Sequence, residues 1–254
     1  MNPKIKITAG PMLCKRAEPS VHFGGPPNGL VRKERPVRPG NSISIAGGEA
    51  GTATVMVKQL GANDGATYLL SCEHVLKPNN QEAASILQPA LQDATGTGNL
   101  NRIGNKVTVA GLSEFKSNQI DAAIVQLNSG IKGQNLTSEG NWPIFSVDRN
   151  YDDGMPVTMV GRSSGQVEGM IVNASVDQEM DYSELGWLKP IYFSGIAQCD
   201  YPCQPGDSGA PVLNSATGSL VGIHMAGGSD EVGNSFGFFC PAWQVFDQLH
   251  LQLI

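Results

Sequence analysis

The fold of this chain is decided by the stretch Pro205-Gly206-Asp207-Ser208-Gly209-Ala210-Pro211-Val212, where a serine lies in a tight, glycine-flanked turn before an apolar strand. Two more stretches belong with it. A histidine stands at the exit of an apolar strand in Ser71-Cys72-Glu73-His74-Val75-Leu76. An aspartate opens a strand of small and apolar residues in Asn118-Gln119-Ile120-Asp121-Ala122-Ala123-Ile124-Val125. Each stretch taken singly has an ordinary explanation, because Asp and Gly are common in turns and caps.

Taken together, the three polar residues follow the order His74, Asp121, Ser208, with gaps of 47 and 87 residues. Serine is a poor nucleophile unless a base takes its proton, and histidine is the side chain best suited to be that base. An aspartate can hold the imidazole in the correct tautomer. The order and the residue types therefore predict a Ser-His-Asp catalytic triad.

The rest of the chain is typical of an all-β protein. Charged residues make up 16 % and aromatic residues 6 %, while 31 glycines and 16 prolines divide the chain into short segments. Turn signals such as Asp152-Asp153-Gly154 separate short apolar or alternating runs, which predicts a sandwich or barrel. After Pro241 the apolar residues have helical spacing, which predicts a C-terminal α-helix. We expect strands within 52–57, 67–72, 107–110, 120–127, 155–160, 167–176, 191–198, 210–213, 219–225 and 236–240.

The N-terminal region, residues 1–42, is rich in Pro and Gly and is expected to be an irregular basic arm. Its first 40 residues contain eight basic and two acidic residues, a charge of +6 in a chain whose net charge is −6. Such an arm could fold back on the acidic remainder, bind an acidic partner or remain a solvated tail. The overall negative charge argues against nucleic-acid binding by the whole chain.

No apolar run is long enough for a membrane span, and Lys6, Gly10 and Pro11 interrupt the segment where a secretion signal would need an apolar core. We therefore expect a cytoplasmic protein that does not bind membranes. Five cysteines, an odd number, then favour reduced thiols over a disulfide framework. The alternatives are one disulfide, for instance Cys203 with Cys240, or a metal held at Cys199 and Cys203.

The three stretches resemble the signatures of the chymotrypsin-like serine peptidases, namely His74-Val75, Asp121-Ala122-Ala123-Ile124 and Gly206-Asp207-Ser208-Gly209. The resemblance covers roughly residues 45–254 and is strongest to bacterial, intracellular members. It implies two packed six-stranded antiparallel β-barrels with the triad at their junction. We expect a first barrel over 43–130, a connector over 131–142, a second barrel over 143–240 and the helix over 241–254.

The same resemblance implies a serine endopeptidase that acts on protein or peptide substrates without cofactor or metal. Ser208 would be the nucleophile, His74 the general base and then acid, and Asp121 the residue that orients His74. The N–H groups of Gly206 and Ser208 would form the oxyanion hole. Gly206 suits that role because a turn that aims consecutive N–H groups inward often needs positive φ.

The expected substrate specificity depends on the second strand after Ser208, around residues 220–228. Gly222-Ile223-His224 resembles the bacterial glutamyl endopeptidases, and Ile223-His224-Met225-Ala226-Gly227-Gly228 resembles the picornaviral cysteine proteases. The resemblance implies that His224 contacts a Glu or Gln side chain before the scissile bond, while the alternative is a structural core histidine. Pro202 stands where an enzyme that cuts after Lys or Arg would have Asp. The expected substrate-binding residues are Pro202, His224, Met225, Ala226 and Gly227.

Two further points stay open. Val160-Gly161-Arg162-Ser163-Ser164-Gly165 resembles a hairpin turn of bacterial members, in which Arg162 is either structural or near the oxyanion or an acidic substrate. Ile45-Ala46-Gly47-Gly48 resembles a mature N-terminus whose amine would pair with Asp207, but we favour a site formed without cleavage, with Asp207 paired internally. The alternative functions are a partner-gated or inactive binding module and an esterase or acyltransferase that uses the same serine.

Overall fold

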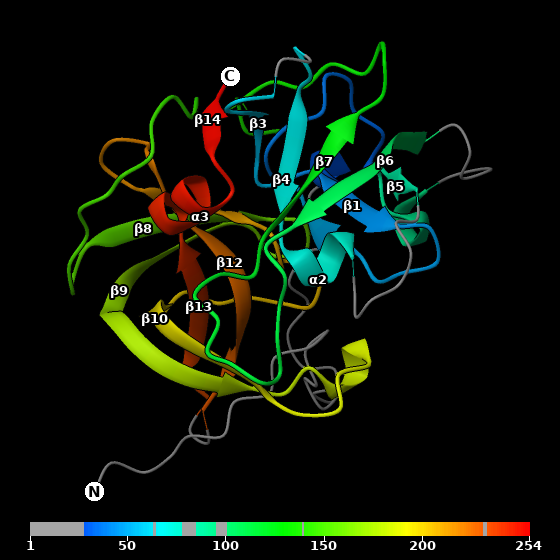
Figure 1. Cartoon of the computed structure of the whole chain (residues 1–254). Helices are drawn as coiled ribbons and strands as arrows, with labels where there is room; N and C mark the ends of the chain where they lie inside the picture. Colours follow the sequence, from blue (N-terminus) through cyan, green and yellow to red (C-terminus); the bar gives the residue numbers. More distant parts are fainter. Residues whose placement is uncertain (1–27, 63–64, 78–84, 95–100, 139, 231–232) are drawn as a thin grey trace, which may run out of the picture.

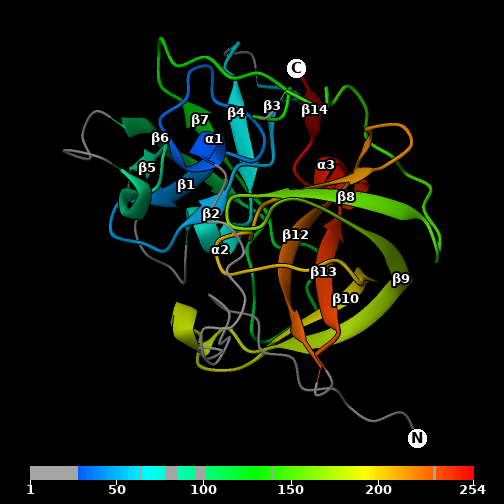
Figure 2. The ribbon, with the colours of Figure 1, turned by 180° about the vertical axis from the view of Figure 1, so that it is seen from behind.

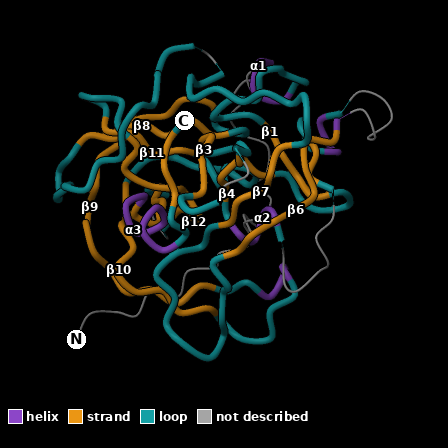
Figure 3. The backbone as a smooth tube through the Cα atoms, turned by 45° about the horizontal axis from the view of Figure 1, so that its top comes forward, coloured by secondary structure: helices purple, strands orange, loops and turns teal. Residues whose placement is uncertain are grey.

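Two antiparallel β-sheets make up most of the computed structural model, which describes residues 28–62, 65–77, 85–94, 101–138, 140–230 and 233–254. They lie side by side, one built mainly from the N-terminal half of the chain and one from the C-terminal half (Figure 1). Helices are short and few in this part of the chain (Figure 3). None of the described helices is long and apolar enough to cross a membrane.

The second sheet is a closed barrel of six strands in the order β10-β13-β12-β11-β8-β9, as predicted, and its ring is clear from behind (Figure 2). The barrel begins with the hairpin of β8 and β9, in which Gly161 pairs with Gly165 and residues 162–164 form the turn. Gly165 has φ +70°, which a side chain would make costly. The strands are β8 Pro156–Gly161, β9 Gly165–Met180, β10 Ile191–Cys199, β11 Pro211–Asn214, β12 Leu220–Ser229 and β13 Ser235–Pro241.

The first sheet, which we call the first barrel, differs from the predicted closed barrel of six strands, because it contains eight strands in the order β14-β3-β4-β7-β6-β5-β1-β2. The difference arises from short segments without strong periodicity, such as the two-residue strands β2 and β5. The strands are β1 Ser42–Ile45, β2 Gly51–Thr52, β3 Val55–Gln59, β4 Tyr68–Ser71, β5 Ile86–Leu87, β6 Arg102–Val109, β7 Ala123–Leu127 and β14 Leu251–Leu253.

The C-terminal helix is shorter than predicted. Helix α3 spans Ala242–Gln248, and the chain then forms β14, which pairs with β3 of the first sheet. His250 has φ +54°, a left-handed conformation that ends the helical path. Leu249, Leu251 and Leu253 fit the two-residue period of a strand as well as the continuation of a helix, so the apolar pattern alone could not distinguish strand from helix here.

Of the predicted irregular arm over 1–42, residues 1–27 lie outside the described residues, and the remainder packs into the molecule. Helix α1 spans Asn28–Val31, and Leu30 and Val37 are fully buried. The N–H of Val37 donates to the carbonyl of Lys132, and Gln134 returns a bond to Val37, so the arm joins the connector. Turn-rich composition concealed this packing because few apolar residues carry it.

The two barrels meet where the turn around Ser208 touches β2 and β4. Thr52 N–H donates to the Ser208 carbonyl at 2.8 Å, and the Thr54 hydroxyl donates to the Gly209 carbonyl at 2.6 Å. A Cβ atom on Gly209 would lie 2.2 Å from both the Ser71 hydroxyl and the Thr52 carbonyl oxygen. Close contact between the barrels therefore requires glycine at position 209.

We expect Gly209→Ala to destabilise the protein by roughly 3–5 kcal/mol, because it adds a backbone clash to the cost of positive φ. Gly154→Ala is the matched control, since Gly154 also has positive φ, +84°, but nothing lies within 4 Å of its Cβ position. That variant should lose only about 1–2 kcal/mol. Urea unfolding of both variants measures the difference. Equal losses would show that the barrel contact at Gly209 is not tight.

Candidate active site

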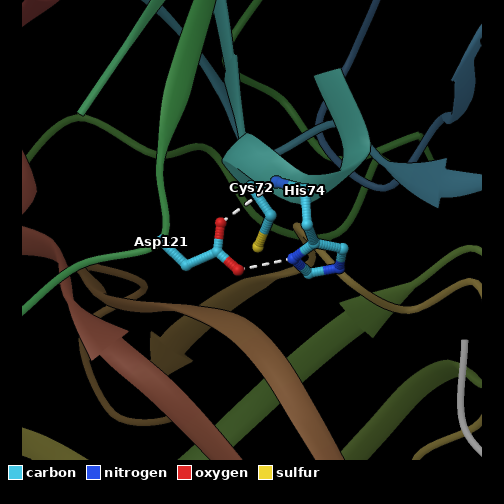
Figure 4. Close-up of side chains that lie close together, drawn as sticks. All are labelled: Cys72, His74 and Asp121. Carbon is cyan, nitrogen blue, oxygen red and sulfur yellow. Dashed lines mark hydrogen bonds and ion pairs between the residues drawn. The ribbon is translucent and has the colours of Figure 1, made fainter. Parts of the chain in front are cut away.

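His74 and Asp121 come together because their strands are neighbours. Helix α2, Glu73–Leu76, follows β4 directly, and Asp121 lies just before β7, which pairs with β4 from Ser71 to Tyr68. The His74 Nδ1 atom lies 2.5 Å from Asp121 Oδ2, and the His74 backbone N–H donates to Oδ1 at 3.2 Å (Figure 4). Both carboxylate oxygens are thus bound to the residue they would orient.

Tyr182 is a third partner of this carboxylate, and sequence reasoning missed it. Its hydroxyl donates to Asp121 Oδ2 at 2.7 Å, and its ring meets the His74 ring edge-on with centroids 5.4 Å apart. Burial would raise the pKa of Asp121, but the charge of His74 and the hydrogen bonds from His74 and Tyr182 bring that pKa below its ordinary value. Tyr182 precedes the 3-10 helix η3, Ser183–Leu185, where no motif marks it.

Glu73 is a second buried carboxylate beside the histidine. It accepts hydrogen bonds from the N–H groups of Gly111 and Leu112, and so fixes the loop that leads from β6 to Asp121. Burial, and then the negative charge of Asp121, raise the pKa of Glu73 to about 7.

Ser208 lies in the turn between β10 and β11 and lines the same cleft as His74, with a volume of about 470 Å³. Its hydroxyl donates to the Met225 carbonyl at 3.4 Å. Gly206, which also lines the cleft, has φ +98°, the conformation expected for it from the sequence. Asp121 stands behind His74 with no exposed surface. The structure therefore brings His74 against Asp121 and into one cleft with Ser208, while the Ser208 hydroxyl bonds to Met225 rather than to His74.

Asp207 is held internally by neutral donors, as favoured above. Its carboxylate accepts the N–H groups of Ser163, Ser164 and Gln204 and the Ser164 hydroxyl, and burial raises its pKa despite these bonds. Ile45 is buried in β1 and pairs with Ile86. A freed amine at Ile45 is therefore not what supports Asp207 in this structure.

The expected substrate-binding residues lie near the serine but outside the cleft lining. His224 is only 2 % exposed, its carbonyl accepts the Gly209 N–H at 2.8 Å, and its Nδ1 lies 3.1 Å from the Tyr201 hydroxyl. Burial, and then the charge of His74, lower the pKa of His224 to about 3. Cys203 fills the space beside Gly227, where an added Cβ would lie 2.3 Å from its Sγ. Pro202, His224, Met225, Ala226 and Gly227 do not line the cleft that Ser208 and His74 share.

Donor atoms of Cys72, His74 and Asp121 lie within 4.8 Å of one another, close enough to bind a metal ion (Figure 4). Their existing bonds oppose this. The Cys72 thiol donates to the His224 carbonyl at 3.3 Å, and burial raises its pKa well above the ordinary value, so the thiolate that a metal needs is disfavoured. Cys72, Cys199, Cys203 and Cys240 form no disulfide with one another, so the alternative pairing of Cys203 with Cys240 is not formed, and Cys14 lies outside the described residues.

Solved structures share this fold at low sequence identity. Protease A of Thermobifida fusca has a TM-score of 0.61 and 18 % identity, over 87 % of this chain and 99 % of its own. A chymotrypsin of Cellulomonas bogoriensis has a TM-score of 0.60 and 20 % identity, over 86 % and 98 %. A glutamic acid specific serine protease, described as using a histidine triad in substrate binding, has a TM-score of 0.62 and 18 % identity, over 86 % and 100 %.

A search of curated protein sequences finds no significant match. The family described as trypsin-like peptidase domain, in contrast, matches residues 51–223, which is more than half of the chain. That range contains His74, Asp121 and Ser208. The chain therefore belongs to the trypsin-like peptidase family and, as a member, is a serine-type endopeptidase.

Proposed function

We propose that this protein cleaves peptide bonds through a triad of Ser208, His74 and Asp121. The observation that carries the proposal is the 2.5 Å contact between His74 Nδ1 and Asp121 Oδ2, with His74 and Ser208 lining one cleft. Asp121 directs the ring so that Nε2 is left to act on the serine. The 3.4 Å bond from the Ser208 hydroxyl to the Met225 carbonyl is long and therefore weak. In the proposed reaction the hydroxyl gives up this bond and donates to His74 Nε2 instead.

In the proposed reaction the Ser208 oxygen attacks the substrate carbonyl carbon while His74 Nε2 takes the hydroxyl proton. The N–H groups of Gly206 and Ser208, which donate to no described residue, would bind the resulting oxyanion. His74 then gives its proton to the leaving amine as the C–N bond breaks. Water, activated by His74, hydrolyses the acyl-enzyme and restores the Ser208 hydroxyl.

For specificity we propose that His224, which is 2 % exposed and does not line the cleft in this structure, becomes accessible when substrate binds and recognises a glutamine side chain more readily than a glutamate. The ring is neutral at pH 7, because burial lowers its pKa to about 3. A Tyr201 hydroxyl that donates to Nδ1 would leave the proton on Nε2. A neutral N–H donor suits an amide carbonyl, whereas a carboxylate would keep an uncompensated charge in a buried site. The glutamate preference of the similar structure described above is the competing outcome.

We expect wild-type protein to be labelled by a fluorophosphonate probe and Ser208→Ala to remain unlabelled. Asp121→Asn should lower kcat by about 10⁴-fold, because it removes the charge that holds the imidazole tautomer. Ser146→Ala is the control, since Ser146 is exposed and its hydroxyl shares a hydrogen bond with the Ser219 hydroxyl. Labelling and peptide turnover of folded proteins measure both effects. Full labelling of Ser208→Ala would contradict the assignment of the nucleophile.

Tyr182→Phe should lower kcat about 10- to 100-fold, because a hydrogen bond to a buried carboxylate is worth about 1.5–3 kcal/mol. Tyr192→Phe is the matched control, since Tyr192 donates to Asp177 at 3.2 Å on an exposed face. The acid limb of the pH profile should move in Tyr182→Phe and stay in place in the control. An unchanged profile and kcat would limit Tyr182 to a role in packing.

At pH 7 the protein should cleave a peptide with Gln before the cleaved bond faster than the same peptide with Glu at that position. Because His224 stays neutral down to a pH of about 3, the preference should shrink as pH falls and the Glu side chain takes up a proton, near pH 4.3 for a free side chain. His224→Ala should remove the discrimination. Preference for Glu at pH 7, or discrimination that survives in His224→Ala, would contradict the proposal.

A further inference from the structure

Arg162, in the turn between β8 and β9, is the centre of a hydrogen-bond network beside the turn that carries Ser208. The side chain is 17 % exposed and lines the cleft with Gly206. Its Nε donates to Asp93 Oδ2 at 2.9 Å and its Nη2 donates to Asp93 Oδ1, a two-point bond between the barrels. Asp93 lies in the 3-10 helix η1, Leu91–Asp93, of the first half and also accepts the Ser42 hydroxyl.

Two hydroxyl groups connect Arg162 to the peptides on either side of Gly206. Ser163 Oγ accepts from Arg162 Nη1 at 2.9 Å and donates to the Pro205 carbonyl at 2.6 Å. Thr52 Oγ1 accepts from the Arg162 backbone N–H at 3.0 Å and donates to the Gly206 carbonyl at 2.8 Å. A hydroxyl has one proton, so each bond accepted from Arg162 leaves that proton free for a carbonyl of the turn.

The direction of the Gly206 N–H follows from the bond that Ser163 Oγ donates to the Pro205 carbonyl. A trans peptide is planar, and its C=O and N–H groups point in opposite directions. Because Ser163 holds the Pro205 carbonyl on its own side, the Gly206 N–H points to the other side. Thr52 fixes the next peptide in the same way, so neither plane beside Gly206 can rotate without losing a hydrogen bond.

Packing supports this arrangement independently of the hydrogen bonds. A Cβ on Gly206 would lie 2.5 Å from Ser163 Oγ and 3.2 Å from both Arg162 Cδ and Nη1. The turn therefore lies directly against the two residues that hold it, and φ +98° at Gly206 is the conformation they stabilise.

We infer that Arg162 is a positioning residue of the oxyanion hole, which keeps the Gly206 N–H directed at the substrate carbonyl. Its guanidinium acts through Ser163, and its backbone N–H acts through Thr52. The inference rests on the proposed peptidase function. Asp93 anchors Arg162 to the first half of the molecule, so the hole is held in its working geometry only while the two barrels are docked. Arg162 makes no bond to substrate in this role.

The test compares Arg162→Met and Ser163→Ala with Arg149→Met, which breaks the exposed ion pair of Arg149 with Asp247. Active-site titration with a fluorophosphonate gives the concentration of reactive Ser208, so kcat is expressed per active site. We expect about 10- to 100-fold lower kcat in Arg162→Met and Ser163→Ala, since loss of a complete oxyanion donor costs about 10²–10³-fold. KM should change less than threefold. A peptide aldehyde should bind more weakly in proportion to kcat.

The double variant Arg162→Met with Ser163→Ala should be no slower than the slower single variant, because the guanidinium acts through the Ser163 hydroxyl. Thr52→Val tests the second peptide with nearly unchanged side-chain shape and should also lower kcat. Should Arg162→Met fail to fold, Ser163→Ala and Thr52→Val still decide the matter. The inference would be overturned if Ser163→Ala and Thr52→Val both had the same kcat per active site as Arg149→Met.

A measurement without turnover separates this inference from the proposed function. The Gly206 amide should give one sharp NMR resonance in wild-type protein and a broadened or doubled one in Ser163→Ala, because its peptide can then rotate. If the wild-type protein resists the fluorophosphonate and the Gly206 resonance still broadens or doubles in Ser163→Ala, the peptidase proposal is refuted and the positioning role of Arg162 is left intact. An unchanged Gly206 resonance in Ser163→Ala would refute the positioning role.

Discussion

A carboxylate with no exposed surface, that of Asp121, is the constraint on which the rest of this structure depends. An unpaired buried charge costs several kcal/mol, so the fold must supply partners for it. Three donors do so, namely the His74 ring, the His74 backbone N–H and the Tyr182 hydroxyl. The requirement to stabilise Asp121 in the folded state therefore also fixes the imidazole in the geometry that catalysis needs.

These donors come from both halves of the chain, which explains why the site lies at the junction of the barrels. His74 follows β4 of the first sheet, whereas Tyr182 follows β9 of the second. Cys240, at the end of the second barrel, accepts the Asp121 backbone N–H at 3.1 Å. Separate barrels would leave Asp121 partly unpaired, so docking of the barrels and formation of the triad acid are one event.

The sequence was informative wherever chemistry is concentrated in a short stretch. His74, Asp121 and Ser208 each lie at the end of a strand with clear periodicity, so their strands and order could be predicted from local pattern. The contact of Tyr182 with Asp121 could not be predicted, because the two residues are 61 positions apart and no motif marks Tyr182. The turn at Arg162 was identified, but its partner Asp93 was not, because Asp93 lies 69 positions away in a stretch without a motif. Strand β14 was missed for a different reason, since its alternate leucines satisfy both helical and strand spacing.

Asp121 and Asp207, two of the buried carboxylates in this site, are stabilised by different chemistry, and the difference has consequences for its pH dependence. Asp121 faces an imidazole, a group that changes charge in the range where proteins work. Asp207 is bound by three N–H groups and a hydroxyl, which keep their protons throughout that range. An α-amino group in the same place would lose its proton near pH 8 and release the aspartate. Under the proposed mechanism, alkaline pH therefore leaves the Ser208 turn intact.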